Sequence, residues 1–181
     1  MAGSSFWLDQ YDRKANQPLT WRLAGDNLLV AAEVLFRAYR DALSKPIGVG
    51  GSVPKGWRLL SPILLLRAAA LEALLKGRAV RRGHRFVVQG SFCPIPKAGK
   101  GHDLVQLADA TAFRLNQDER DMLSRLSPQL ELARYPVGKF WQTGLKKDPR
   151  PGVGHVLGAY YVSSDEAVFA RLVKRLRRAV Q

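Results

Sequence analysis

Apolar side chains recur at every third or fourth position over most of this chain, which is the spacing of helices with one buried face. The pattern predicts two long helices in the first half. One runs from a cap at Thr20 to the Pro- and Gly-rich loop that begins at Ser44, and one from about Leu59 to Lys76. The second is apolar nearly all round, so we expect it to be the central helix of the fold. Gly77 is the expected signal for its end.

The second half of the chain predicts three further helices. One follows the pair His102–Asp103, one follows Asn116, and the last runs to the end of the chain. Each starts at a residue that can cap a helix, and the last two carry a glutamate three positions on: Asp103, Asn116 with Glu119, and Ser163 with Glu166. Residues 85–89 and 156–162 leave room for short β segments. The pattern as a whole predicts one all-α domain over residues 1–181.

Positive charge is the strongest feature of the composition. The chain has 29 Lys and Arg against 15 Asp and Glu, which gives a formal net charge of +14. Such an excess favours a polyanionic partner, nucleic acid before an anionic membrane surface, over a basic surface that serves only solubility. No acidic residue stands between Glu72 and Asp103, whereas this interval holds the bases Lys76, Arg78, Arg81, Arg82, Arg85, Lys97 and Lys100. The C-terminal segment ARLVKRLRRAVQ adds further bases.

Cysteine usage and hydropathy narrow the class of protein further. The single cysteine, Cys93, cannot form an internal disulfide or a multi-cysteine metal site, which fits a reducing compartment. The start of the chain lacks the pattern of a signal peptide, and the most apolar stretch is short and carries Arg67 and Glu72. We therefore expect a cytoplasmic protein without membrane insertion.

The stretch KAGKGHDLVQLADA has the glycines and lysines of a phosphate-binding loop, but not their order. A P-loop needs a glycine five positions before its Gly-Lys pair and a Ser or Thr after the lysine, and Pro94 and Gly101 occupy these places. His84, His102 and His155 are far apart in sequence and form no metal-ligand pair. No nucleophile-elbow motif supports a Ser-His-Asp triad. We therefore predict neither a metal nor a cofactor.

Four motifs follow one another in the order seen in a known family. They are the alanine-rich helix AGDNLLVAAEVLFRAY, the pair Glu72 and Lys76 within LEALLKG, the loop KGHDLVQLADA, and the helix end LELARYP with Arg134 and Tyr135. In this order and spacing the chain resembles the HEPN family (higher eukaryotes and prokaryotes nucleotide-binding domain) over about residues 22–136. The loop and helix of residues 137–181 lie outside the resemblance.

The resemblance implies an antiparallel four-helix bundle, often dimeric, to which the C-terminal helix is an addition. It implies binding of RNA or nucleotides, in a defence or toxin–antitoxin-type system. Some members of the family are metal-independent endoribonucleases, and others are non-catalytic subunits that accompany a nucleotidyltransferase. We therefore expect an RNA- or nucleotide-binding protein, which can form a homodimer. The alternatives are an endoribonuclease, or an interaction subunit whose partner is an antitoxin or a nucleotidyltransferase.

His102 is the candidate catalytic residue of the endoribonuclease alternative. Cleavage of RNA without a metal needs a base near the 2′-hydroxyl and cations around the phosphate, and histidine titrates in the useful range. The expected binding residues lie around it or in the basic interval: Lys97, Lys100, Asp103, Arg134, Tyr135, Arg78, Arg81 and Arg82. The structural alternative is that Arg134 and Tyr135 only terminate their helix and that His102 anchors its own.

Two other histidines have the spacing of the ribonuclease signature, which places a histidine a few residues after an arginine. Arg78 precedes His84 and Arg150 precedes His155, so both histidines stay as alternatives to His102. Both pairs depart from the family pattern, because an alanine follows Arg78 and a proline follows Arg150 where a polar residue is usual. Before His102 itself, the corresponding position holds Lys97 instead of an arginine.

Overall fold

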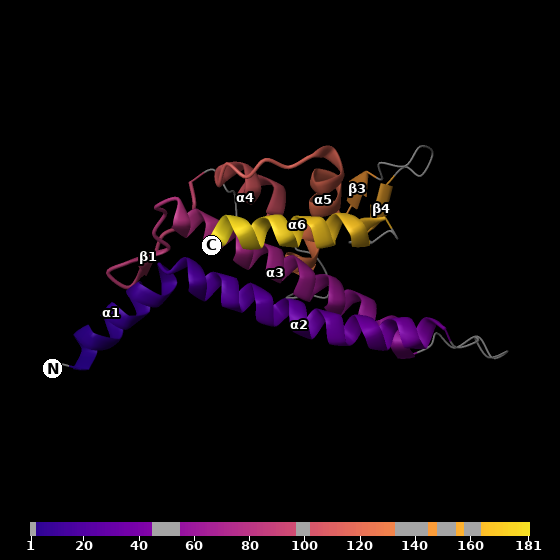
Figure 1. Cartoon of the computed structure of the whole chain (residues 1–181), viewed down its shortest axis with the longest axis horizontal. Coiled ribbons are helices and arrows are strands. Elements are labelled where there is room, and N and C mark those ends of the chain that lie inside the picture. Colours follow the sequence, from indigo (N-terminus) through magenta and orange to yellow (C-terminus); the bar gives the residue numbers. More distant parts are fainter. Residues whose placement is uncertain (1–2, 45–54, 97–101, 133–144, 148–154, 158–163) are drawn as a thin grey trace.

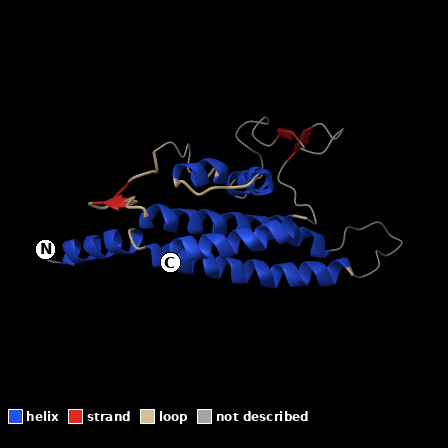
Figure 2. Cartoon of the chain, turned by 45° about the horizontal axis from the view of Figure 1, so that its top comes forward, coloured by secondary structure: helices blue, strands red, loops and turns tan. Residues whose placement is uncertain are grey.

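The computed structural model describes residues 3–44, 55–96, 102–132, 145–147, 155–157 and 164–181, and this part of the chain is mostly helical (Figures 1 and 2). The predicted all-α class is therefore confirmed. The helices are α1 (Gly3–Ala15), α2 (Pro18–Leu43), the 3-10 turn η1 (Lys55–Leu59), α3 (Leu60–Arg81), α4 (Leu104–Ala110), α5 (Gln117–Leu132) and α6 (Asp165–Val180). The helix that the sequence predicts from Thr20 is α2, and it begins earlier, at Pro18. Gln17 is its N-cap, and proline is favoured in the first turn of a helix.

Two antiparallel strand pairs complete the described residues: β1 (Val87–Val88) with β2 (Ser91–Phe92), and β3 (Leu145–Lys147) with β4 (His155–Leu157). The first pair is a tight hairpin. Its two turn residues, Gln89 and Gly90, have positive φ of 51° and 76°, which matches the right-handed twist of the strands. The short β segments for which the sequence left room, at 85–89 and 156–162, are thus present as β1 and part of β4.

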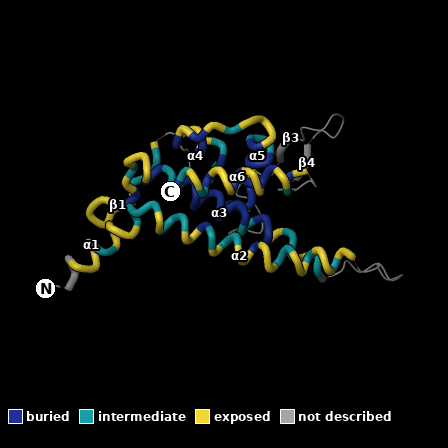
Figure 3. The backbone as a smooth tube through the Cα atoms, viewed as in Figure 1, coloured by how far each residue is buried: buried dark blue, intermediate teal, exposed yellow. Residues whose placement is uncertain are grey.

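Helix α3 is the centre of the molecule, as its all-round apolar pattern predicts. It contacts α2, α4, α5 and α6, and most of its length is buried (Figure 3). The main core joins Leu71 and Leu74 of α3 to Leu107 of α4, Met122 of α5 and Leu172 of α6. The C-terminal helix is therefore part of the core and not an appendage on its surface.

Gly77 does not end α3, contrary to the sequence expectation, and the helix continues to Arg81. A Cβ at Gly77 would lie 2.9 Å from Val180 of α6 and 3.3 Å from the carbonyl oxygen of Pro18 in α2. The glycine is thus needed because two other helices approach closely. The residue that ends the helix is Gly83, which has φ of 92° directly after the C-cap.

Pairs of contacts give the directions of the helices. The end of α3 meets the start of α2 and the end of α6 at Gly77, so α2 is antiparallel to α3. At the other end of α6, Glu166 binds Arg67 near the start of α3, so α3 and α6 are parallel. Helix α5 is antiparallel to α6, because Glu119 at its start binds Arg175 near the end of α6.

The predicted caps have different outcomes. Asp103 accepts hydrogen bonds from the backbone N–H groups of the second and third residues after it, at 3.0 Å each, and Asn116 and Glu119 exchange bonds of 2.9 and 3.0 Å. Both predictions are confirmed. Ser163 lies outside the described residues, and the carboxylate of Glu166 instead takes two bonds of 2.8 Å from Arg67.

Candidate nucleic-acid interface

Several arginines of the helical core are neutralised by a carboxylate. Arg120 of α5 binds Asp109, Arg175 of α6 binds Glu119, and Arg177 binds Asp26, with nitrogen–oxygen distances of 2.5 to 3.0 Å. Arg120 lowers the pKa of the Asp109 carboxyl through its hydrogen bonds. These arginines join helices, and each of them has a carboxylate beside it. They contribute little free positive charge to the surface.

The end of α3 carries arginines that have no such partner. Arg81, Arg82 and Arg85 are exposed there, and none of them forms a salt bridge with any residue that the structure describes. Arg78 lies one turn before. Burial is the main cause that lowers its pKa, and the charges of Arg82 and Arg81 lower it further. The positive charges at this end are thus close enough to repel one another, so an anion bound there would relieve the repulsion.

Other elements add cations at the same end. Asn16, between α1 and α2, accepts hydrogen bonds from the backbone of Phe86 and Val87 at 2.7 and 3.3 Å, which fixes the end of α1 beside β1. The exposed bases in the last turn of α1 and of α6 therefore lie near those of α3 (Figure 1). We call this surface the basic end, and it comprises Arg13, Lys14, Arg81, Arg82, Arg85 and Arg178.

Arg78, predicted as a binding residue, holds backbone oxygens. Its Nε and Nη2 donate to the carbonyls of Thr111 and Ala112 at 3.1 and 2.9 Å, and its guanidinium lies 5.3 Å from the ring centroid of Phe113. These contacts join the end of α3 to the turn that links α4 and α5. Arg81 and Arg82 make no such contacts with the described residues, and both residues are exposed.

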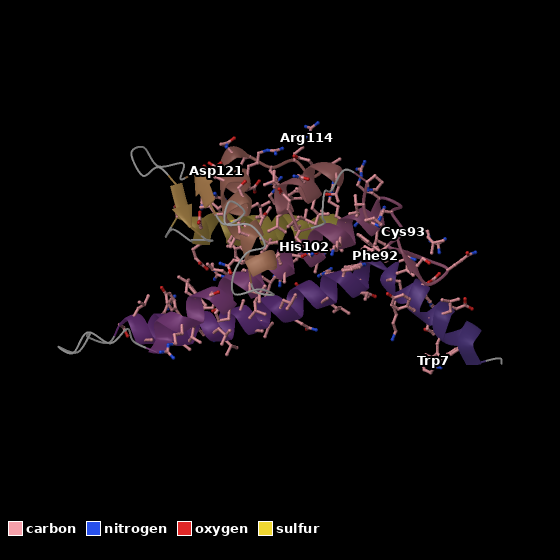
Figure 4. All side chains as sticks on the ribbon, turned by 180° about the vertical axis from the view of Figure 1, so that it is seen from behind. Trp7, Phe92, Cys93, His102, Arg114 and Asp121 are labelled. Carbon is pink, nitrogen blue, oxygen red and sulfur yellow. The ribbon has the colours of Figure 1, made fainter. Side chains whose placement is uncertain are left out.

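His102 lies against the side of α3 (Figure 4). Its Nδ1 is 3.5 Å from Oε2 of Glu72, and the other carboxylate oxygen of Glu72 binds Nζ of Lys76. Glu72 is nearly buried, whereas His102 is partly exposed. Lys76 lies 5.5 Å from the ring centroid of Trp21 in α2. The structure thus brings together the glutamate and lysine of the LEALLKG motif with the histidine of the following loop.

This arrangement has two chemical uses. A hydrogen bond from Nδ1 to Glu72 leaves Nε2 of His102 as the proton acceptor, which is the form that a general base requires. The same contact also anchors the start of α4, together with the cap from Asp103 and a 3.0 Å bond from the backbone N–H of Leu104 to Ser127. The geometry is compatible with both uses.

The remaining predicted site residues are distributed as follows. Lys97, Lys100, Arg134, Tyr135 and Arg150 lie outside the described residues, and of His155 only the backbone, in β4, is described. His84 holds the β1–β2 hairpin, because its Nε2 is 3.1 Å from the carbonyl oxygen of Cys93 and its ring lies 4.6 Å from that of Phe86.

One surface feature does not follow from the sequence pattern, namely a groove of about 370 Å³ beside the basic end. It lies between α1, the first turns of α2 and the hairpin, and its walls include Tyr11, Trp21, Phe86 and Phe92. We call it the aromatic groove. Its residues come from three separate segments, and α1 itself was not predicted. The only indication of the groove in the sequence is the cluster of aromatic residues near the start of the chain.

Comparison with known protein families, with curated proteins and with solved structures finds no match for this chain. In the part of the chain that the structure describes, no group of three or more His, Cys, Asp or Glu side chains could hold a metal ion. Within the same residues, every helix is either too short or too polar to cross a bilayer.

Proposed function

We propose that this protein is an HEPN-like protein that binds RNA or nucleotides through its basic end, in a defence or toxin–antitoxin-type system. The observation that carries the proposal is the exposed cluster Arg81, Arg82 and Arg85, which has no carboxylate beside it among the described residues. Arginine suits a phosphate because its guanidinium can bind two oxygens at once. The setting rests wholly on the resemblance to the family.

The arrangement of helices supports the same proposal. Helices α3, α5 and α6 share one core, against which Leu29 of α2 packs. Helix α2 is antiparallel to α3 and α5 is antiparallel to α6, whereas α3 and α6 are parallel. We propose that these are the four helices of the bundle that the resemblance implies. The bundle then includes the C-terminal helix, which the resemblance placed outside it. The homodimer stays a prediction.

The affinity for a short single-stranded RNA should fall steeply as salt is added. Each phosphate that an arginine neutralises releases a counterion, and single strands give a slope of about −0.7 in log K against log salt for each contact. Three arginines in contact with phosphates would give a slope of about −2. Fluorescence anisotropy with a labelled oligonucleotide, at several potassium chloride concentrations, measures it. A flat response would contradict the proposal.

A metal-independent endoribonuclease is the second candidate, and the contact between His102 and Glu72 favours it. This alternative predicts that the wild-type protein cleaves labelled RNA in the presence of EDTA. His102→Ala should then cleave at least about 100-fold more slowly, because it removes the general base. His84→Ala is the parallel variant, because His84 is the alternative catalyst and its Nε2 lies 3.1 Å from the carbonyl oxygen of Cys93 in the hairpin. Equal rates for wild type and His102→Ala would exclude His102 as the catalyst.

The third alternative, an interaction subunit, makes a different prediction about partners. A basic surface can serve to bind an acidic antitoxin or a nucleotidyltransferase, in place of RNA. In that case the protein would co-purify with an acidic partner, and its affinity for RNA would be low. The salt titration of the free protein with RNA therefore separates this alternative from the leading proposal.

A further inference from the structure

We propose that the aromatic groove takes an unpaired base of single-stranded RNA, while the neighbouring phosphates lie on the basic end. This inference rests on the proposed function and adds to it a base-binding site. The lining of the groove does not include His102, although Lys76, which binds Glu72, lies over the ring of Trp21. The site would select for strands whose bases are not paired, because a base in a duplex is already stacked on both faces.

The walls of the groove have the composition and the exposure of a stacking platform. Phe92 and Tyr11 are 61% and 55% exposed, although both are large apolar side chains. Behind them, Phe86 is almost fully buried, and its ring stacks on that of Phe92 with a centroid distance of 6.1 Å and an interplanar angle of 18°. The ring centroid of Trp21 lies 5.1 Å from that of Phe86, with the two rings tilted by 51°. A planar ligand can therefore extend an array of rings that already exists.

The polar groups at the groove fit a nucleotide better than they fit an apolar peptide. Lys14 and Thr20 are part of its lining, and none of the lining residues that the structure describes is acidic. Arg85 directly precedes Phe86, so the exposed arginines of the basic end begin where the aromatic wall ends. The groove has a volume of about 370 Å³, which lies within the range of about 300–1,000 Å³ that small-molecule sites usually have.

The groove is held in shape before any ligand binds. Asp12 of α1 accepts hydrogen bonds from the backbone N–H groups of Gln89 and Gly90 at 2.8 and 2.9 Å. Trp21 donates from its Nε1 to the carbonyl oxygen of Ala15 at 2.8 Å, and Lys76 lies over its ring. These bonds fix α1, α2 and the hairpin to one another. A preformed site costs less conformational entropy on binding.

The test compares two RNAs on the whole protein: a short single strand, and the same strand with its central bases removed. Stacking on an aromatic side chain contributes about tenfold or more in affinity per base, so wild type should prefer the intact strand by about tenfold. Phe92→Ser should lose this preference and keep its affinity for the abasic strand. Tyr11→Ser, at the other wall, should do the same. Phe92 lies on the surface, so its loss should leave the core intact.

The matched control is Phe6→Ser. Phe6 is 55% exposed, as Tyr11 is, and it also lies on α1, but it is not part of the groove. Its neighbour Trp7 lies toward the free end of α1, away from Phe92 (Figure 4). This control should retain the preference for the intact strand.

The outcomes separate the two proposals. Equal binding of both RNAs by wild type, with a steep salt dependence, would overturn the base site and leave the proposed function standing. A preference that Phe92→Ser and Tyr11→Ser both retain would likewise exclude the groove as its cause. Failure to bind either RNA would overturn both proposals. The last outcome concerns co-purification with an acidic partner. If the wild-type protein co-purifies with such a partner and Phe92→Ser and Tyr11→Ser do not, the groove binds a protein and not a base.

Discussion

Replacing Arg67 by alanine is expected to lower the free energy of unfolding by about 3 kcal/mol. The side chain of Arg67 is 3% exposed, although it ends in a guanidinium group. Both terminal nitrogens bind Glu166 at 2.8 Å, and the guanidinium lies 4.5 and 4.7 Å from the rings of Phe36 and Phe169. One side chain thus joins α2, α3 and α6.

The alanine variant loses these contacts together. It removes two charge-assisted hydrogen bonds and two cation–π contacts, and it leaves a cavity between three helices. Glu166 is 44% exposed, so water can solvate its carboxylate again, and for this reason the expected loss is at the lower end for a broken buried pair. Urea unfolding followed by far-ultraviolet circular dichroism would measure the loss as a lower midpoint with an unchanged slope.

Arg37→Ala is the control for this measurement, because Arg37 also forms an ion pair, with Glu33 at 2.9 Å. Its side chain is 74% exposed, and an exposed pair four residues apart on one helix stabilises by only about 0.5 kcal/mol or less. A loss for Arg67→Ala that is no larger than the loss for Arg37→Ala would show that the buried pair does not hold the three helices together.

The central part of the fold could be predicted because its signal is local. The apolar residues of α3 repeat on every side, so burial from all directions follows from the sequence. The caps at Asp103 and Asn116 also depend on residues only two or three positions apart. Gly77 was misinterpreted, because a glycine required by two neighbouring helices has the same local signature as one that ends a helix. Only the tertiary contacts distinguish the two.

The candidate site was predictable only in part, for a similar reason. Glu72 and Lys76 are four residues apart on one helix, so their contact follows from helical spacing, whereas His102 reaches Glu72 from thirty residues further along the chain. Helix α1 was not predicted, because its large side chains do not form a buried stripe and Trp7 is 70% exposed. Without α1, the aromatic groove could not be assembled from the sequence.

The triple variant Arg81→Ser, Arg82→Ser, Arg85→Ser is expected to bind single-stranded RNA about 100-fold more weakly than wild type. The loss of each charge-assisted bond from an arginine to a phosphate costs about 1 kcal/mol or more of binding free energy. Among the described residues, no carboxylate forms a salt bridge with any of the three side chains. The loss should be similar for RNAs of different sequence, since phosphates carry no sequence information. The slope of log K against log salt should become about 2 smaller in magnitude.

A control with the same loss of charge distinguishes a site from a general attraction. Arg37, Arg40 and Arg58 are also exposed, but they lie near the end of α2 and the start of α3, which is the opposite end of this antiparallel pair. Their replacement by serine removes three charges and should reduce the affinity only a few-fold, because charges more than a Debye length of about 8 Å away are largely screened at physiological salt. If both triple variants lose affinity equally, net charge and not the basic end attracts the RNA. If neither does, the positive charge at the end of α3 serves another partner.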